Sequence, residues 1–156
     1  MQLLQSAVRL DRNPIPRMST DAERQSKYAW TLIKRAAPPK RSAELRVADF
    51  REIYSEFDEA AARDQAARCI QCPDALCMKG CPLANRIPEW MALTAQGAFL
   101  EAAAVSRATS NMPEICSRVC PQERLCEGSC ILNARTEPVS IGAIASGGFG
   151  LAVELV

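Results

Sequence analysis

The hydrophobic positions of this chain recur mostly at spacings of three and four residues, which is the period of an α-helix. The clearest apolar stripe predicts a helix and consists of Val47, Phe50, Ile53, Tyr54 and Phe57. Residues 99–107 predict another helix. Because no segment alternates convincingly between apolar and polar residues, as a half-buried strand does, the sequence predicts an all-α fold.

Helix start signals give this pattern boundaries. Thr20 and Glu23 have the spacing of a capping box, which predicts a helix from there to about Arg35. Asp58 is placed to cap an alanine-rich helix that delivers Cys69 to the protein interior.

Two prolines mark further helix starts. Pro88 suits the first turn of a helix that contains Trp90, and Pro113 opens a short one. We expect Trp90 to serve core packing rather than ligand binding. With 156 residues, 48% hydrophobic and 24% charged, the chain has a globular composition, but only 5% of it is aromatic. We therefore expect the cysteines to help hold the fold together.

Charge divides the chain into parts. The formal net charge of +1 excludes a strongly basic nucleic-acid binder. The first part is basic and the second is slightly acidic, and all eight cysteines lie in the second. We predict a basic arm with a helix at 1–46, a helical iron–sulfur domain at 47–145 and a glycine-rich apolar tail at 146–156.

A basic run surrounds the Pro38-Pro39 break and consists of Lys34, Arg35, Lys40, Arg41 and Arg46. Such a run is either a solvated linker or a docking patch for an acidic partner.

No export signal or membrane span is visible, so we expect a cytoplasmic protein without a membrane or nucleic-acid partner. In that compartment thiols stay reduced, and eight cysteines indicate metal or redox chemistry rather than a disulfide scaffold.

The cysteines form two closely spaced sets, each with a Cys-Pro step. The first set is Cys69, Cys72, Cys77 and Cys81, and the second is Cys116, Cys120, Cys126 and Cys130. In bacterial ferredoxins the cysteine before proline binds the other of two clusters. Two 4Fe–4S clusters would use seven or eight thiolates and account for both Cys-Pro steps.

Three alternatives are weaker. The alternative function is a zinc-stabilised protein-interaction module without redox function, which would bind a partner through its basic arm. Structural zinc favours two CxxC knuckles, whereas only Cys69 and Cys72 form one here. Structural disulfides are disfavoured by the expected compartment. A catalytic thiol would lack its usual partner, because the chain contains no histidine.

Three segments resemble a known family: EAAARDQAARCIQCPDALCMKGCPLANRIPEW, SNMPEICSRVCPQERLCEGSC and PVSIG. They are similar to the N-terminal iron–sulfur domain of the glutamate synthase small subunit, which also occurs in dihydropyrimidine dehydrogenase and related flavin-dependent oxidoreductases. The resemblance covers roughly residues 48–144. It implies an all-helical domain with two 4Fe–4S clusters.

The resemblance also implies crossed ligation. Cys130 would join the first cluster, with Cys69, Cys72 and Cys77. The second cluster would be held by Cys81, Cys120 and Cys126. Because each cluster would tie together distant parts of the sequence, we expect cluster assembly and folding to be coupled.

In that family the clusters pass electrons between the flavin of an NADPH-dependent domain and a partner subunit such as the glutamate synthase large subunit. Here Ser146-Gly147-Gly148-Phe149-Gly150 is glycine-rich, but too few residues follow for a dinucleotide-binding unit. We therefore expect FAD and NADPH on another domain or partner, and an electron-transfer part that is not catalytic alone. The sequence leaves open whether it is a fragment.

One position departs from the family. Ala145 stands where the family typically has Glu or Gln, and in dihydropyrimidine dehydrogenase that side chain completes one cluster. Because a methyl group cannot bind iron, Cys116 is the candidate fourth ligand of the second cluster. The alternative is that Cys116 only packs nearby.

Overall fold

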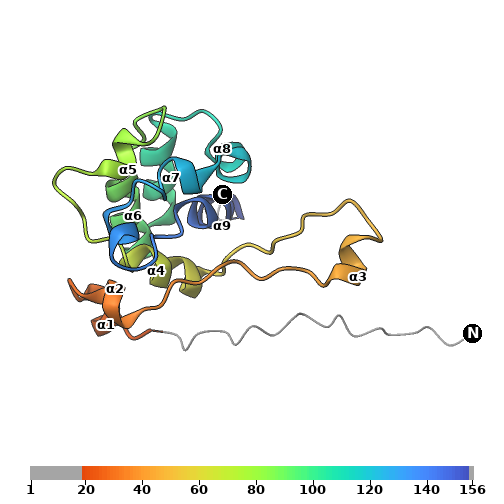
Figure 1. Cartoon of the computed structure of the whole chain (residues 1–156), viewed down its shortest axis with the longest axis horizontal. Helices are drawn as coiled ribbons and strands as arrows, with labels where there is room; N and C mark the ends of the chain where they lie inside the picture. The colour runs from red at the N-terminus through yellow and green to blue at the C-terminus, as the bar shows by residue number, and fades with distance from the viewer. Residues whose placement is uncertain (1–18, 155–156) are drawn as a thin grey trace, which may run out of the picture.

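The protein is described by a computed structural model, which covers the backbone of residues 19–154 and the side chains of residues 19–147. Residues 1–18 of the predicted basic arm and residues 155–156 of the predicted tail lie outside the described residues. The elements, labelled in Figure 1, are α1 Asp21–Gln25, α2 Ala29–Leu32, α3 Ala43–Arg46, α4 Glu59–Ala67, α5 Leu76–Lys79, α6 Ile87–Gln96, α7 Phe99–Arg107, α8 Pro113–Val119, η1 Gln122–Arg124, η2 Ile131–Ala134 and α9 Ile141–Glu154.

The described residues are helical, as predicted, and contain one isolated bridge, between Lys40 and Tyr54, but no strand. The Thr20 side chain accepts a hydrogen bond from the Glu23 backbone, and the Glu23 carboxylate accepts one from the Thr20 backbone, so the capping box is confirmed. The helix that it opens is shorter than predicted. It ends before Ser26, whose backbone is extended, and α2 follows as a separate turn.

The prediction of a helix over residues 47–57 is wrong. Only α3, just before that span, is helical, and the chain beyond it runs back mostly as irregular extended backbone. Val47 and Phe50 are exposed, whereas Phe57 at the end of the span is buried. The first part of the stripe therefore has no surface of its own domain to pack against, and without that packing so short a helix is unstable.

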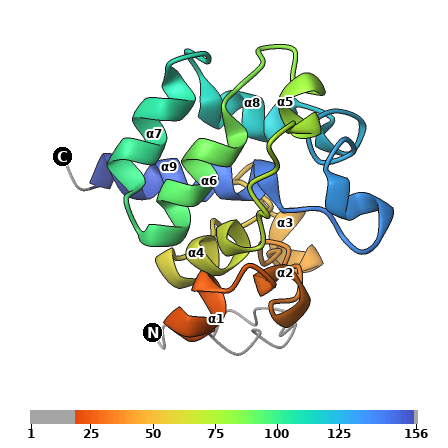
Figure 2. The ribbon, with the colours of Figure 1, turned by 90° about the vertical axis from the view of Figure 1, so that its left-hand side faces the viewer.

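The core lies where α4, α6, α7 and α9 pack together (Figures 1 and 2). Asp58 caps α4, and Pro88 lies in the first turn of α6, both as predicted. Trp90 is 2% exposed, and its indole N–H donates to the Asn85 side chain, which in turn donates to Ser106 of α7. The predicted packing role of Trp90 is confirmed.

The segment before α4 is packed on the body. Arg24 forms an ion pair with Asp64 at 2.5 Å, and both side chains are largely buried. Gln65 accepts a hydrogen bond from the Ala36 backbone and donates to the Lys34 carbonyl. Residues 19–36 therefore pack along α4 in an ordered path and are not a solvated linker.

Helix α9 begins at Ile141 and includes most of the span predicted as a glycine-rich tail. Gly147 lies against the residues that precede α4, because an added Cβ would come within 2.9 Å of the Phe57 backbone nitrogen. Within residues 19–154, no helix is both long and apolar enough to cross a membrane.

Candidate metal centres

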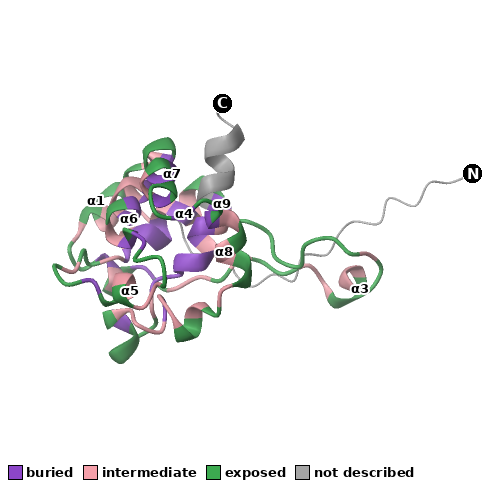
Figure 3. Cartoon of the chain, turned by 90° about the horizontal axis from the view of Figure 1, so that it is seen from above, coloured by how far each residue is buried: buried purple, intermediate pink, exposed green. Residues whose placement is uncertain are grey.

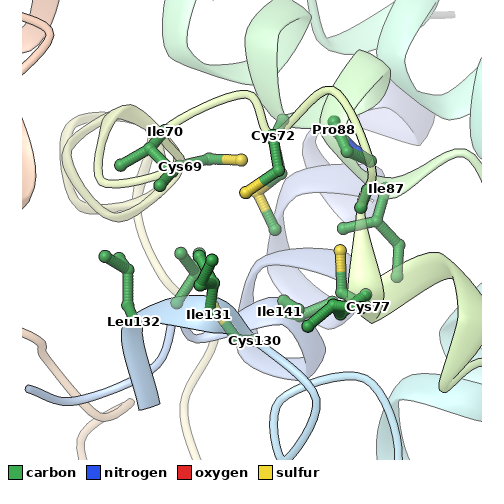
Figure 4. Close-up of a pocket in the computed structure, with 14 residues that line it drawn as sticks. Cys69, Ile70, Cys72, Cys77, Ile87, Pro88, Cys130, Ile131, Leu132 and Ile141 are labelled. Carbon is green, nitrogen blue, oxygen red and sulfur yellow. The ribbon is translucent and has the colours of Figure 1, made fainter. Parts of the chain in front are cut away.

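Four cysteines from three segments surround one pocket (Figure 4). Cys69 and Cys72 lie in the loop after α4, Cys77 is in α5, and Cys130 precedes η2. Every pair within this group is close enough for each thiol to influence another's ionisation. The structure thus brings Cys130 to the CxxC loop, although 57 residues lie between it and Cys72 in the sequence.

The pocket is otherwise apolar, with Ile87, Met91 and Ile141 among its lining residues. Burial, with smaller contributions from the neighbouring thiols, Cys77 first, raises the pKa of Cys69 to about 12. Burial also raises the pKa of Cys77 to about 11. These thiols are therefore protonated at neutral pH unless a cationic group binds them, and a metal that binds them displaces their protons.

The remaining four cysteines form a second group. Burial raises the pKa of the Cys120 thiol, and the nearby Cys116 and Cys81 thiols contribute to the rise. Cys126 is near Cys81, and burial raises its pKa to about 12. The structure thus places Cys81, which belongs to the first sequence set, with the second.

The two sequence segments meet at Gly80. An added Cβ there would lie 2.2 Å from the Ser129 hydroxyl and 2.9 Å from the Leu125 carbonyl. Only glycine allows this approach, which brings the turn between Cys77 and Cys81 against the loop between Cys126 and Cys130. The crossing of the two sets is therefore a property of the backbone packing.

The loop between Cys69 and Cys72 contains an unusual backbone conformation. Gln71 has a φ of 53°, in the left-handed region that non-glycine residues rarely adopt. Its neighbour Arg68 is 1% exposed and donates to the carbonyls of Glu137 and Pro138, each at 2.9 Å. The end of α4 and the start of the CxxC loop are thereby fixed to the segment before α9.

Cys116 and Ala145 lie on adjacent helices, since α8 packs against α9. Ala145 is buried among core residues. Pro113 opens α8 as predicted, and the Cys120 N–H donates to the Cys116 carbonyl at 3.0 Å. The Cys116 sulfur lies 3.9 Å from the Ser110 hydroxyl. The helix therefore presents Cys116 and Cys120 together.

Sequence reasoning missed the residues that hold the PVSIG segment. The buried Glu127 accepts hydrogen bonds from the Gly142 backbone at 3.0 Å and from Arg35 at 2.6 Å. Ser140 accepts a hydrogen bond from Arg35 and donates one to Ala36. A buried carboxylate at the start of α9 is favourable because a helix N-terminus is electropositive. The sequence signal for this role was that Glu127 is the one acidic residue between Cys126 and Cys130.

The donor set fits an iron–sulfur cluster. All eight cysteines are free, half-buried thiols. Among the residues that the structure describes, no three Cys, Asp or Glu side chains converge tightly enough for a single metal ion. The first group instead surrounds a space with apolar walls, and a cluster whose irons occupy four corners requires ligands around a space.

Comparison with known proteins gives matches to the same part of the chain. The family described as dihydropyrimidine dehydrogenase domain II, 4Fe-4S cluster, matches residues 46–146. The small chain of NADPH glutamate synthase from Escherichia coli K12 is 45% identical over 120 residues, which are 77% of this chain. The corresponding chain of Azospirillum brasilense is 49% identical over 108 residues, or 69% of this chain.

A more distant small chain, from Bacillus subtilis, is 39% identical over 118 residues, or 70% of this chain. The matched part makes up 25%, 22% and 24% of these three relatives, so the chain spans about a quarter of their length.

Proposed function

This chain belongs to the family of 4Fe–4S domains described for dihydropyrimidine dehydrogenase domain II, and from that membership we propose that it relays electrons between an NAD(P)H-dependent flavoprotein and a partner oxidoreductase. Its cofactor class is the iron–sulfur cluster, and its general role is electron transfer. We propose that the partner resembles a glutamate synthase large subunit, because the relatives are glutamate synthase small chains.

We propose two clusters. The first would be held by Cys69, Cys72, Cys77 and Cys130. The second would be held by Cys81, Cys120 and Cys126, with Cys116 as its fourth ligand. The observation that carries this proposal is the spatial grouping of the thiols, in which each group combines cysteines from both sequence sets.

The protein's own residues would hold and shield the clusters. When bound, a 4Fe–4S cluster accepts and releases electrons. The walls formed by Ile87, Met91 and Ile141 exclude water from the first group, and such burial influences the reduction potential. The close contact of Gly80 with Ser129 and Leu125 holds the two cysteine groups next to each other, which suits stepwise electron transfer between two clusters.

The test of the relay uses the cluster-loaded chain under anaerobic conditions, with cluster reduction followed by loss of visible absorbance. NADPH alone should not reduce the clusters, whereas NADPH with a flavoprotein reductase should. A glutamate synthase large subunit added afterwards should restore the oxidised spectrum. FAD bound to the 156-residue chain, or clusters that the reductase cannot reduce, would contradict the proposal.

A further inference from the structure

Residues 39–55 leave the helical body, pass through α3 and return, and we call them the projecting arm. Figure 1 shows the arm extending away from the other helices, and Figure 3 shows how much of it is exposed. Its two limbs are joined by backbone hydrogen bonds. The Arg41 N–H donates to the Ile53 carbonyl at 2.9 Å, and the Ser55 N–H donates to the Pro39 carbonyl at 2.8 Å.

Side chains stiffen the arm further. The Arg41 guanidinium donates to both carboxylate oxygens of Asp49, at 2.8 and 2.7 Å, and holds the pKa of that carboxyl at about 2. The Lys40 ammonium lies 5.1 Å from the centre of the Tyr54 ring. The arm is therefore preorganised, which lowers the entropy lost when a partner binds it.

The tip of the arm is apolar and uncovered. Val47 is 87% exposed and Phe50 is fully exposed. Neither side chain belongs to the buried core, so their exposure does nothing for the stability of this domain. Exposed apolar groups gathered on a rigid projection are typical of a surface that a partner covers.

The charges around the tip indicate the chemistry of that partner. Arg46 and Arg51 flank the apolar residues, and the Arg51 side chain is 85% exposed, with its Nε 4.0 Å from Asp49. The acids Asp49 and Glu52 are paired with Arg41 and Arg118. Glu44 lies in α3 together with Arg46, and its pKa is lowered first by backbone hydrogen bonding and further by the charge of Arg46. The four cations of the arm outnumber its three acids, and Arg51 is largely exposed, so a complementary surface is acidic.

The base of the arm is fastened beside the second cysteine group. The Arg118 guanidinium of α8 donates to Glu52 at 2.7 Å and to Glu56 at 2.9 Å. The same helix contains Cys116 and ends at Cys120. A protein that binds the arm therefore lies closer to the second cysteine group than to the pocket of the first cysteine group.

We propose that the projecting arm docks a second polypeptide, the redox partner of the second cysteine group, by inserting Val47 and Phe50 into an apolar recess with an acidic rim. The partner's role rests on the proposed function, whereas the docking chemistry rests on the arm itself. Arg46 and Arg51 contact the rim, and Val47 and Phe50 provide the buried contact.

The experiment measures binding of the cluster-loaded chain to a purified bacterial glutamate synthase large subunit. Val47→Ser/Phe50→Ser should weaken binding at least about tenfold, because two apolar anchors are lost. Arg46→Glu/Arg51→Glu should weaken it similarly and reduce its dependence on salt. Leu100→Ser, at an exposed apolar residue on α7, is the matched control and should bind as the unchanged chain does.

Iron content, helical circular dichroism and spectra are measured on the same samples. Absence of iron–sulfur clusters from these samples would contradict the proposed function. Arm variants with intact clusters and undiminished binding would overturn the docking proposal alone. Absence of binding by the unchanged chain would also overturn it. Self-association that Val47→Ser/Phe50→Ser abolishes would identify a second copy as the occupant and would likewise overturn it.

Discussion

Individual side chains around the cysteines belong to two kinds, those that would bind iron and those that fix the loops. The eight thiols are the first kind by their chemistry, since they are the preferred ligands of iron–sulfur clusters. Arg68, Gly80 and Glu127 are the second kind. Arg68 bonds to the segment that precedes α9, Gly80 lies against the loop around Cys126, and Glu127 bonds to the first turn of α9.

The role of Cys116 can be tested by Cys116→Ser. If it is the fourth ligand, the variant should lose or convert the second cluster while the first remains, because the two groups have separate thiols. Electron paramagnetic resonance and redox titration of both clusters provide the measurement, with Ser110→Ala as a control that removes only the neighbouring hydroxyl. Unchanged spectra and potentials for both clusters would show that Cys116 is not a ligand.

Arg68→Met should destabilise the domain. The side chain is 1% exposed and its guanidinium donates to two carbonyls, so the substitution leaves both acceptors without these bonds. A buried acceptor left without its hydrogen bond costs about 1–3 kcal/mol, so for two acceptors we expect a loss of about 2–6 kcal/mol in the free energy of unfolding. Chemical denaturation measures it. Arg68→Lys should recover part of the loss, and equal stability of Arg68→Met and the unchanged protein would contradict this role.

At the level of elements, Gly80→Ala and Gly97→Ala form a matched pair. Gly80 has a φ of −76°, so alanine there is strained only by the contacts with Ser129 and Leu125. Gly97 ends α6 with a φ of 85°, and its nearest neighbour would be 3.7 Å from an added Cβ. We therefore expect Gly97→Ala to cost about 1 kcal/mol in stability, with full iron content.

Gly80→Ala should instead lower iron content, because it forces the two cysteine segments apart. Iron per chain and thermal melting of the two variants check this difference. Equal iron content in both would contradict the claim that the Gly80 approach aligns the two groups.

Local signals predicted elements wherever a cap and a packed face coincide. Asp58 with α4, and Pro88 with α6, are such cases. The stripe from Val47 to Phe57 has helical spacing, but spacing alone does not reveal whether an apolar face packs within the domain. On the arm that face is exposed, and the cross-limb bond between Arg41 and Ile53 is a contact that no local pattern encodes.

The site was predictable in composition but less so in arrangement. Cysteine spacing indicated clusters, and the resemblance implied that Cys130 joins Cys69. The contact of Gly80 with Ser129 that accompanies this crossing is a tertiary feature. The same is true of Arg35, which looked like part of a solvated run and instead contacts Glu127 and Ser140.

At the scale of the whole molecule, the helical core and the cysteine loops have different sources of stability. The core of α4, α6, α7 and α9 buries Trp90, Met91 and Ile144. The cysteine loops contain only short helices, such as α5 and η1, and much of their order would depend on metal.

Removal of the clusters by a chelator and oxidant should therefore reduce helical circular dichroism and melting temperature. Hydrogen exchange should rise most in residues 69–81 and 116–131 and least in α6 and α7. Exchange measured by mass spectrometry before and after removal checks this order. An apo form with the same exchange rates and a cooperative melt at the same temperature would contradict the coupling of clusters to folding.

We propose that the eight cysteines hold two 4Fe–4S clusters. The most direct test of this proposal is the iron, acid-labile sulfide and zinc content of the protein purified anaerobically. We expect about eight iron and about eight sulfide per chain, the content of two such clusters, in coloured protein. Colourless protein with stoichiometric zinc and no sulfide would contradict the proposal.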